Sequence, residues 1–515
     1  MITPFSWLVP MLVLLPLIGA GLTLAAAGRT WIQRAVSLSV LAGMLIAAGV
    51  LLWAADTHGP QVMHVGGWTP YEGIVLVVDR LAALMVIVST TVTMAVLAYS
   101  VGQGASSFDE ESDGHAPLPV FHPTILVLAA GVTTTFIAGD LFHIYVGFEM
   151  LLAASFVLLT LGGTRERVRA GVTYVLVSLL SSMIFLAAIA MVYGATGTIN
   201  LALLSERLGE IDPSTAVLLH LLLLVGFAVK AAVFPMSGWL PDSYPTAPAP
   251  VTAVFAGLLT KVGIYAIIRT QTLLFPNSNL EQLLLWASLL TMVVGILGAI
   301  AQDDIKRMLS FILVSHIGYM LFGVALGSTH GLASAIFYVV HHILIQTTLF
   351  LVVGLIERVG GSSDSTKLGD LARISPLLAI LFFVPAMNAA GIPPFSGFLG
   401  KVGLIQAGTA DGSWLAIVVV VGSVVTSLLT LYAIAKVWGR AFWSENAKGL
   451  VGTGPLRGGH HSALGIGVLV PTMSLVVVGV GITLVAGPLF GVATRAAVDL
   501  MLRTPYLEAV LGVGM

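Results

Sequence analysis

Apolar stretches of about 20 residues recur along nearly the whole sequence, and this repetition restricts the fold more than any other feature. Each stretch is long enough to cross a hydrocarbon core of about 30 Å as a helix. Of the residues, 57% are hydrophobic and only 9% are charged, whereas soluble domains contain about 25% charged residues. A backbone surrounded by lipid must satisfy its own hydrogen bonds. The sequence therefore predicts an all-α polytopic membrane protein with a single membrane domain, residues 1–515.

Charged and Pro/Gly-rich breaks divide the sequence into about fourteen predicted transmembrane helices. Their centres lie near residues 15, 43, 90, 130, 152, 181, 225, 260, 291, 317, 344, 390, 427 and 477. Helices 1–3 occupy residues 1–120, helices 4–8 residues 121–272, helices 9–13 residues 280–442, and helix 14 with a C-terminal tail residues 443–515. No basic region precedes the first apolar run, residues 4–27. It is predicted to be a transmembrane helix, and a signal peptide cleaved near LAAAG is the alternative.

The distribution of basic residues predicts the orientation, because cytoplasmic loops hold most lysines and arginines. With the N-terminus outside, thirteen of the 22 basic residues fall on the inner side: Arg29, Arg34, Arg165, Arg167, Arg169, Lys306, Arg307, Arg358, Lys367, Arg373, Arg440, Lys448 and Arg457. Five fall on the outer side: Arg80, Arg207, Arg269, Arg495 and Arg503. We therefore predict a multi-pass protein of the cell membrane with both termini on the extracellular side.

The remaining basic residues lie within predicted helices and are all lysines: Lys230, Lys261, Lys401 and Lys436. A lysine, unlike an arginine, can lose its proton when it is desolvated, so it can take part in proton transfer. Lys436 lies near the inner end of its helix, where its stem can extend to the interface. A charge near mid-membrane costs about 2.5–3.5 kcal/mol. We therefore expect a functional role for the other three lysines, and the alternative is that each forms a structural ion pair.

Two helix-breaking segments resemble each other, PMSGWL at 235–240 and PFSGFL at 394–399. The first lies in predicted helix 7 and the second in predicted helix 12. Because these helices are five apart, they cross the membrane in opposite directions. The pattern predicts two inverted five-helix repeats, in which interrupted helices mark the transport site. The residues predicted to break the helices are Pro235, Gly238, Pro393 and Pro394.

A proline inside a helix leaves the carbonyl four residues earlier without its donor. Pro393 and Pro394 would free the carbonyls of Ala389 and Ala390, and Pro235 would free that of Ala231. Such groups are tolerated at membrane depth where protein or water satisfies them. The breaks therefore predict a hydrated polar cavity beside Lys230, with a simple packing kink as the alternative.

Glu149 is the one acidic residue deep in a predicted helix, and His341 and His342 lie mid-membrane. A pairing with Glu149 would keep Lys230 charged, whereas separation would favour loss of its proton. An imidazole can pass a proton between its two nitrogens, although structural histidines with hydrogen bonds are the alternative. The residues predicted to transfer protons are, in chain order, Glu149, Lys230, Lys261, His341, His342 and Lys401.

Several kinds of site are excluded by what the sequence lacks. The chain has no cysteine, which excludes disulfides, thiolate zinc sites and iron–sulfur ligation. It has neither a GxGxxG motif nor a GxxxxGK[ST] phosphate loop. The net charge of −2 and scattered basic residues do not indicate a nucleic-acid partner. We expect no cofactor and no metal site.

Three stretches resemble the antiporter-like subunit family shared by multisubunit cation/proton antiporters, respiratory complex I and membrane-bound hydrogenases. They are FEMLLAASFVLLTLGGTRERVRAGVTYVLVSLLSS, KAAVFPMSGWLPDSYPTAPAPV and LLTKVGIYAIIRT, and they look most like the D subunits of Mrp-type sodium/proton antiporters. The resemblance implies fourteen helices, broken helices 7 and 12, and membership of a hetero-oligomer embedded in lipid.

The resemblance also implies roles for individual residues. The family's functional glutamate and lysine of helices 5 and 7 match Glu149 and Lys230, and its helix 8 lysine matches Lys261. Its helix 11 histidine and helix 12 lysine match His341 and Lys401. One position departs from the pattern: related D subunits often have a lysine where this chain has Gln346.

Two transport functions fit these observations. The first is the proton-translocating subunit of a sodium/proton antiporter, a secondary transporter and not an enzyme, with sodium crossing elsewhere because sodium needs hard oxygen ligands. The second is the proton-pumping membrane arm of a redox complex such as an NADH-quinone oxidoreductase or hydrogenase. A structural scaffold with vestigial ion pairs is a third hypothesis, disfavoured by three mid-span lysines and two related breaks.

Overall fold

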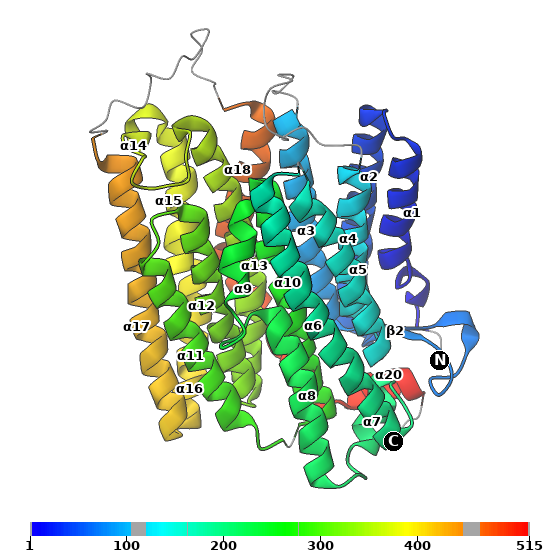
Figure 1. The fold of residues 1–515 in the computed structure, drawn as a ribbon. Helices are drawn as coiled ribbons and strands as arrows, with labels where there is room; N and C mark the ends of the chain where they lie inside the picture. Colours follow the sequence, from blue (N-terminus) through cyan, green and yellow to red (C-terminus); the bar gives the residue numbers. More distant parts are fainter. Residues whose placement is uncertain (1–2, 105–119, 162, 277, 446–463, 513–515) are drawn as a thin grey trace.

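The computed structural model describes residues 3–104, 120–161, 163–276, 278–445 and 464–512. Within these residues the chain is a bundle of helices with a single two-stranded hairpin (Figure 1). The predicted all-α membrane class is confirmed. Lys448 and Arg457, which entered the predicted orientation, lie outside the described residues.

In chain order the elements are α1 (Met11–Ala25), α2 (Thr30–His58), β1 (Gln61–His64), β2 (Val75–Val78), α3 (Arg80–Gly104), α4 (Phe121–Ile137), α5 (Leu141–Thr160), α6 (Arg165–Thr196), α7 (Leu201–Arg207), α8 (Pro213–Ala231), α9 (Trp239–Ser243), α10 (Ala249–Arg269), α11 (Glu281–Ile300), α12 (Ile305–Ala325), α13 (Thr329–Gly360), α14 (Leu371–Ile374), α15 (Pro376–Ala390), α16 (Ser396–Asp411), α17 (Trp414–Val437), α18 (Ile466–Leu484), α19 (Ala486–Leu502) and α20 (Thr504–Leu511). The helices range from four residues in α14 to 32 residues in α6 and α13. Two π-helical turns, Thr270–Leu274 and Trp438–Trp443, extend α10 and α17.

In the described part of the chain, 12 helices are long and apolar enough to cross a membrane. Two shorter apolar helices, α4 and α15, stand at the other expected places. Every predicted centre falls within one of these helices. The count of membrane crossings and the inverted relation of the two repeats remain predictions.

Both termini lie at the same end of the bundle, near the hairpin and α20 (Figure 1). Strands β1 and β2 pair antiparallel, with Gln61 opposite Val78. These strands were not expected from the sequence, because runs of four residues between membrane helices are too short for periodicity to distinguish a strand from a helix end.

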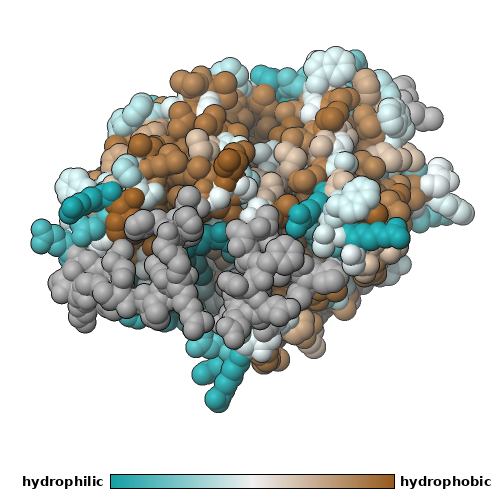
Figure 2. All heavy atoms as spheres, turned by 90° about the horizontal axis from the view of Figure 1, so that it is seen from above, coloured by the Kyte–Doolittle hydropathy of each residue, from teal (hydrophilic) through white to brown (hydrophobic). Residues whose placement is uncertain are grey.

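The centre of the bundle is formed by α10 and α13. Every residue of α10 is buried, and so is the stretch of α13 from Gly331 to Ile356. The periphery is apolar too, and hydrophobic side chains extend to the edge over much of the face seen from above (Figure 2). Leu176 and Met183 on α6 and Leu428 on α17 are more than 60% exposed. Such side chains suit lipid or other apolar chains.

Helix α8 ends at the first expected break. Ala232 takes a left-handed conformation with φ of 58°, and the N–H of Val233 returns to the carbonyl of Ala228 at 2.9 Å. This pattern closes a helix C-terminus. The Phe234–Pro235 peptide is cis, and Gly238 is the N-cap of α9.

Helix α15 ends in the same way 159 residues later. Gly391 is left-handed with φ of 80°, and the N–H of Ile392 returns to the carbonyl of Met387 at 3.2 Å. The Pro393–Pro394 peptide is cis, and α16 starts at Ser396. All three expected prolines therefore lie in an interruption. The left-handed residue and the cis peptide fall at equivalent positions of the two interruptions, whereas α9 begins at Trp239 and α16 begins two positions earlier in the equivalent register, at Ser396.

Different hydrogen bonds with neighbouring side chains hold the two breaks. At the first, the N–H of Phe234 donates to the Thr291 hydroxyl at 3.0 Å, and the Trp239 indole N–H donates to the carbonyl of Val229 at 3.2 Å. At the position of Trp239 in the second break stands Phe398, which has no ring N–H. That break is held by charged and amide side chains instead, which belong to the site.

Candidate functional site

Lys230 occupies the last turn of α8, directly before the first break. It is 8% exposed, and its ammonium has no hydrogen-bond partner among the described residues. The nitrogen lies 5.7 Å from the centre of the Phe148 ring on α5. Phe148 and Phe185 each pack edge to face with Phe227, and the three ring centroids are 4.7–6.0 Å apart. Aromatic faces attract a cation weakly, and the attraction strengthens when the cation is desolvated.

Glu149 follows Phe148 on α5 but does not touch Lys230. The glutamate is only partly buried, and one of its carboxylate oxygens is buried without a partner. No ion pair within 4.0 Å joins the two side chains among the described contacts. The expected direct pairing is therefore absent from this structure. Glu149 is nevertheless the acidic group whose charge acts on Lys230.

Lys261 lies in the middle of the fully buried helix α10. Its side chain is 0% exposed, and its ammonium donates to the carbonyl of Ala256 at 2.6 Å. That bond stays within the same helix, so it ties Lys261 to no other element. The two helices α8 and α10 touch at Ala231 and Gly263, where an added Cβ on the glycine would lie 2.7 Å from the Ala231 nitrogen.

Three histidines gather between Lys261 and the second break. His341 and His342 come from α13, as predicted, and His316 comes from α12. The rings of His316 and His342 are 5.0 Å apart, and both lie near the ring of Tyr338. His316 and His342 have no hydrogen-bond partner at either ring nitrogen among the described residues. Sequence reasoning missed His316, because a lone histidine within an apolar helix forms no pattern.

Lys401 closes the line of buried groups on α16. It is 5% exposed, and its ammonium donates to the carbonyls of Ala390 at 3.1 Å and Ala389 at 3.4 Å. These are the carbonyls that the prolines of the second break were expected to free. The ammonium also lies 4.8 Å from the centre of the Tyr319 ring. Lys401 therefore caps the end of α15, where the helix dipole favours a cation.

The structure brings four of these nitrogen groups into one cluster. The charges of Lys261 and Lys401 both act on His342 and on His316, and His341 adjoins them. Glu149 is the charged group that acts on Lys230. Gln346, one turn beyond His342, donates to the carbonyl of Leu309 at 2.9 Å, so it is held by backbone.

No described carboxylate lies within 4.0 Å of Lys230, Lys261 or Lys401. The alternative was that each of these lysines forms a structural ion pair. None of the three has an acidic partner for such a pair among the described residues. Among those residues, no group of three or more His, Cys, Asp or Glu is placed to hold a metal ion.

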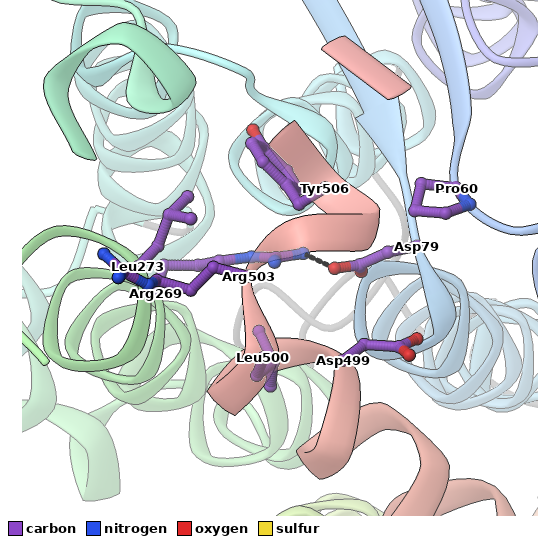
Figure 3. Close-up of a pocket in the computed structure, with 8 residues that line it drawn as sticks. All are labelled: Pro60, Asp79, Arg269, Leu273, Asp499, Leu500, Arg503 and Tyr506. Carbon is purple, nitrogen blue, oxygen red and sulfur yellow. Dashed lines mark ion pairs between the residues drawn. The ribbon is translucent and has the colours of Figure 1, made fainter. Parts of the chain in front are cut away.

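A second charged cluster closes the end of the bundle that holds the termini (Figure 3). Arg269 of α10 pairs with Asp79 before α3 at 2.6 Å, and both side chains are less than 10% exposed. Around them lie Asp499 and Tyr506 from α19 and α20, and the cavity between measures about 10 Å³. A cavity of this size holds one water at most. The sequence analysis had assigned Arg269 only to an outer loop.

Comparison with known proteins identifies the family. Residues 138–429 match the family described as NADH:quinone oxidoreductase/Mrp antiporter, TM. The D subunit of the Na⁺/H⁺ antiporter from Alkalihalophilus pseudofirmus is 36% identical over 504 residues, covering 97% of this chain and 98% of that protein. The D subunit of the Na⁺/H⁺ antiporter from Bacillus subtilis is 33% identical over 510 residues, with 97% and 98% covered.

Two solved structures share the fold over almost the whole chain. A chain of the Mrp complex from Dietzia sp. superposes with a TM-score of 0.90 at 33% identity, covering 99% of this chain and 100% of that chain. A chain of an archaeal membrane-bound sulfane sulfur reductase superposes with a TM-score of 0.85 at 25% identity, with 98% and 100% covered. The protein therefore belongs to the NADH:quinone oxidoreductase/Mrp antiporter transmembrane family, among the relatives of the Na⁺/H⁺ antiporter D subunits.

Proposed function

We propose that this chain is the proton-translocating subunit of a multisubunit sodium/proton antiporter in the cell membrane. The observation that carries the proposal is the buried cluster of Lys261, His342, His316 and Lys401 in the centre of the bundle. Lysine and histidine both bind and release protons, and their neutral forms tolerate a desolvated site. Intramembrane ionisable groups of this kind mark ion pathways.

The proton route runs from Glu149 and Lys230 in the first half to Lys261, the histidines and Lys401 in the second. Glu149 modulates the charge of Lys230 from a distance, and a movement of α5 toward α8 would bring them together. From Lys261 onward, the charges of both Lys261 and Lys401 act on His342 and His316, so these two imidazoles are the groups proposed to connect the lysines. Gaps between these side chains require water, as expected at interrupted membrane helices.

Sodium crosses elsewhere in the complex under this proposal. Sodium binding requires several oxygen ligands, whereas the central cluster consists of nitrogen groups that would repel a cation when protonated. The names of the relatives support sodium as the exchanged ion, and the similar chain of a Mrp complex supports assembly with other membrane subunits. The distribution of basic residues supports extracellular termini.

The proton-pumping arm of a redox complex is the second candidate. Similarity to a chain of a respiratory membrane complex favours it. The antiporter relatives are more similar, at 33–36% identity against 25%, so we place the chain with the antiporters. Mass spectrometry of the complex, extracted gently from native membranes, separates the two. Iron–sulfur or flavin subunits in constant ratio would contradict the antiporter, and small hydrophobic subunits alone would support it.

The proton route itself is tested in sealed vesicles that contain the whole complex. Lys230→Ala is expected to abolish sodium-dependent proton movement while membrane insertion stays at the wild-type level. Lys367→Ala is the matched control, because Lys367 is a surface lysine whose side chain is 67% exposed. Wild-type transport by the Lys230 variant would refute the assignment of this lysine.

A further inference from the structure

A chain of hydrogen bonds crosses the second break and ends on His341. The backbone N–H of Gly397 donates to Oδ1 of Asn388 at 2.8 Å. An N–H group can only donate, so the atom that faces it is the amide oxygen, and the orientation of the Asn388 amide is thereby determined. Gly397 permits this approach, because an added Cβ would lie 2.0 Å from the Asn388 carbonyl oxygen.

The Ser396 hydroxyl lies between Asn388 and His341. Its oxygen is 3.3 Å from Oδ1 of Asn388 and 2.9 Å from Nδ1 of His341. Oδ1 can only accept, so the single hydroxyl proton points toward it and the Ser396 lone pairs face the imidazole. Nδ1 must then bear a proton. If Nδ1 were the acceptor, the Ser396 hydroxyl proton would point to the imidazole, and lone pairs of Ser396 and Asn388 would face each other across 3.3 Å.

The burial of these residues affects the choice between the two neutral tautomers of His341. Asn388 and Ser396 are 0% exposed and His341 is 1% exposed. The Nδ1–H tautomer keeps one hydrogen bond more than the alternative, because the Ser396 hydroxyl then donates to Oδ1 of Asn388 while it accepts from His341. One additional buried hydrogen bond corresponds to roughly a few-fold to tenfold preference for the Nδ1–H tautomer. The other ring nitrogen, Nε2, is buried without a hydrogen-bond partner among the described residues.

We propose that Asn388 and Ser396 are positioning residues that hold His341 as the Nδ1–H tautomer and present the lone pair of Nε2 to the proton route. His341 then accepts a proton at Nε2, becomes an imidazolium with its Nδ1–H bond to Ser396 intact, and returns the proton from Nε2. It does not pass protons through the ring from one nitrogen to the other. This deepens the proposed function and depends on it for the transport consequence only.

The first break has no such device. The residues 159 positions earlier are Val229 and Ser237. A valine side chain cannot accept the serine hydroxyl, so the tautomer-setting chain belongs to the second half of the protein alone. The two breaks therefore share a left-handed residue and a cis peptide and differ in the proton chemistry that they support.

The tautomer is measured directly by solid-state ¹⁵N NMR of the histidine-labelled complex in lipid. The His341 signals are identified by their loss in His341→Gln. We expect a protonated Nδ1 and an unprotonated Nε2 in the wild type. In Ser396→Ala we expect the Nδ1–H pattern to be lost or mixed, and in Ser396→Thr, which retains the hydroxyl, to be kept. A wild-type Nε2–H tautomer, or an unchanged pattern in Ser396→Ala, would overturn the assignment.

Transport tests the positioning role separately. Ser396→Ala and Asn388→Leu are expected to lower sodium-dependent proton movement by about tenfold or more, since a correctly placed acid–base group contributes about 10²–10⁴. Ser396→Thr should restore it. Ser310→Ala is the matched control, because Ser310 is equally buried and its hydroxyl donates to a backbone carbonyl within α12.

The outcomes separate the two proposals. Full transport by Ser396→Ala together with a changed tautomer overturns the positioning role. Full transport by His341→Gln refutes the part of the proposed function that uses this histidine, whereas the NMR result still decides the tautomer. Asn388→Leu provides a second route to the same answer if the serine variant does not assemble.

Discussion

Replacing Asp79 with alanine is expected to destabilise the protein strongly. The Asp79–Arg269 pair is 7% and 4% exposed and 2.6 Å long. Arg269 also lies between the rings of Tyr265 and Tyr506 and donates to the Tyr265 hydroxyl. Removing the carboxylate leaves a buried guanidinium without its counter-charge, which costs about 3–5 kcal/mol. Asp79→Asn should cost less, because its amide oxygen can still accept the N–H of Ala82.

Removing both charges is expected to recover much of the loss, since a neutral replacement of a buried pair is often tolerated. The assay is a double-mutant cycle on thermal unfolding of the detergent-solubilised complex, with Asp79→Asn, Arg269→Met and the double variant. The surface pair Asp242–Arg307, with side chains 63% and 47% exposed, is the control and should contribute about 1 kcal/mol or less. A double variant that loses as much stability as the sum of its single variants would refute the coupling.

Three further predictions concern the site and its surroundings. His316→Phe keeps a ring in the cluster and removes both nitrogens, so proton movement in vesicles should fall at unchanged assembly; unchanged transport would exclude His316. Gly391→Ala should lower the melting temperature by the equivalent of about 1–2 kcal/mol, because φ of 80° is left-handed and the new Cβ would lie 2.8 Å from Cδ of Lys401; an equal melting temperature would contradict this. Hydrogen bonding to the Lys436 ammonium holds the pKa of Asp303 below its usual 3.8, and a depressed pKa contributes stability that is present above that value and lost as pH falls through the folded-state pKa. The stability difference between the wild type and Asp303→Asn should thus stay constant down to about pH 4 and shrink only below it, and a change between about pH 5 and 8 would contradict the assignment.

Apolar length and proline placement were enough to predict the long apolar helices and the two breaks, but not α19 and α20, which occupy the segment predicted as a C-terminal tail. Every predicted span centre falls within an apolar helix, because hydrocarbon thickness sets helix length independently of tertiary contacts. The rule that a proline frees the carbonyl four residues back also predicted that Ala389 and Ala390 would need donors. The rule does not identify the donor. In the structure, the Lys401 ammonium donates to both carbonyls.

The contacts between helices could not be predicted from the sequence. The expected pairing of Glu149 with Lys230 rested on opposite charge and on the family resemblance, neither of which gives a distance. The distance between α5 and α8 depends on the packing of Phe148, Phe185 and Phe227. Asn388 illustrates a second limit. Its importance lies in the partner of its oxygen, and no spacing within α15 indicates that the oxygen meets Ser396 across a break.

The two lysines next to the breaks are coupled to different parts of the protein. Lys401 lies after its break and donates to the carbonyls of Ala389 and Ala390, which lie before the break. Deprotonation of the Lys401 ammonium therefore weakens the cap that joins α15 to α16. Lys230 lies before its break and donates to no described group, so its protonation state changes no hydrogen bond at that break. Its charge is balanced only across a gap, by Glu149 on α5. Under the proposed proton route, proton release from Lys401 would therefore be linked to the geometry of the second break, and proton release from Lys230 to the separation of α5 and α8.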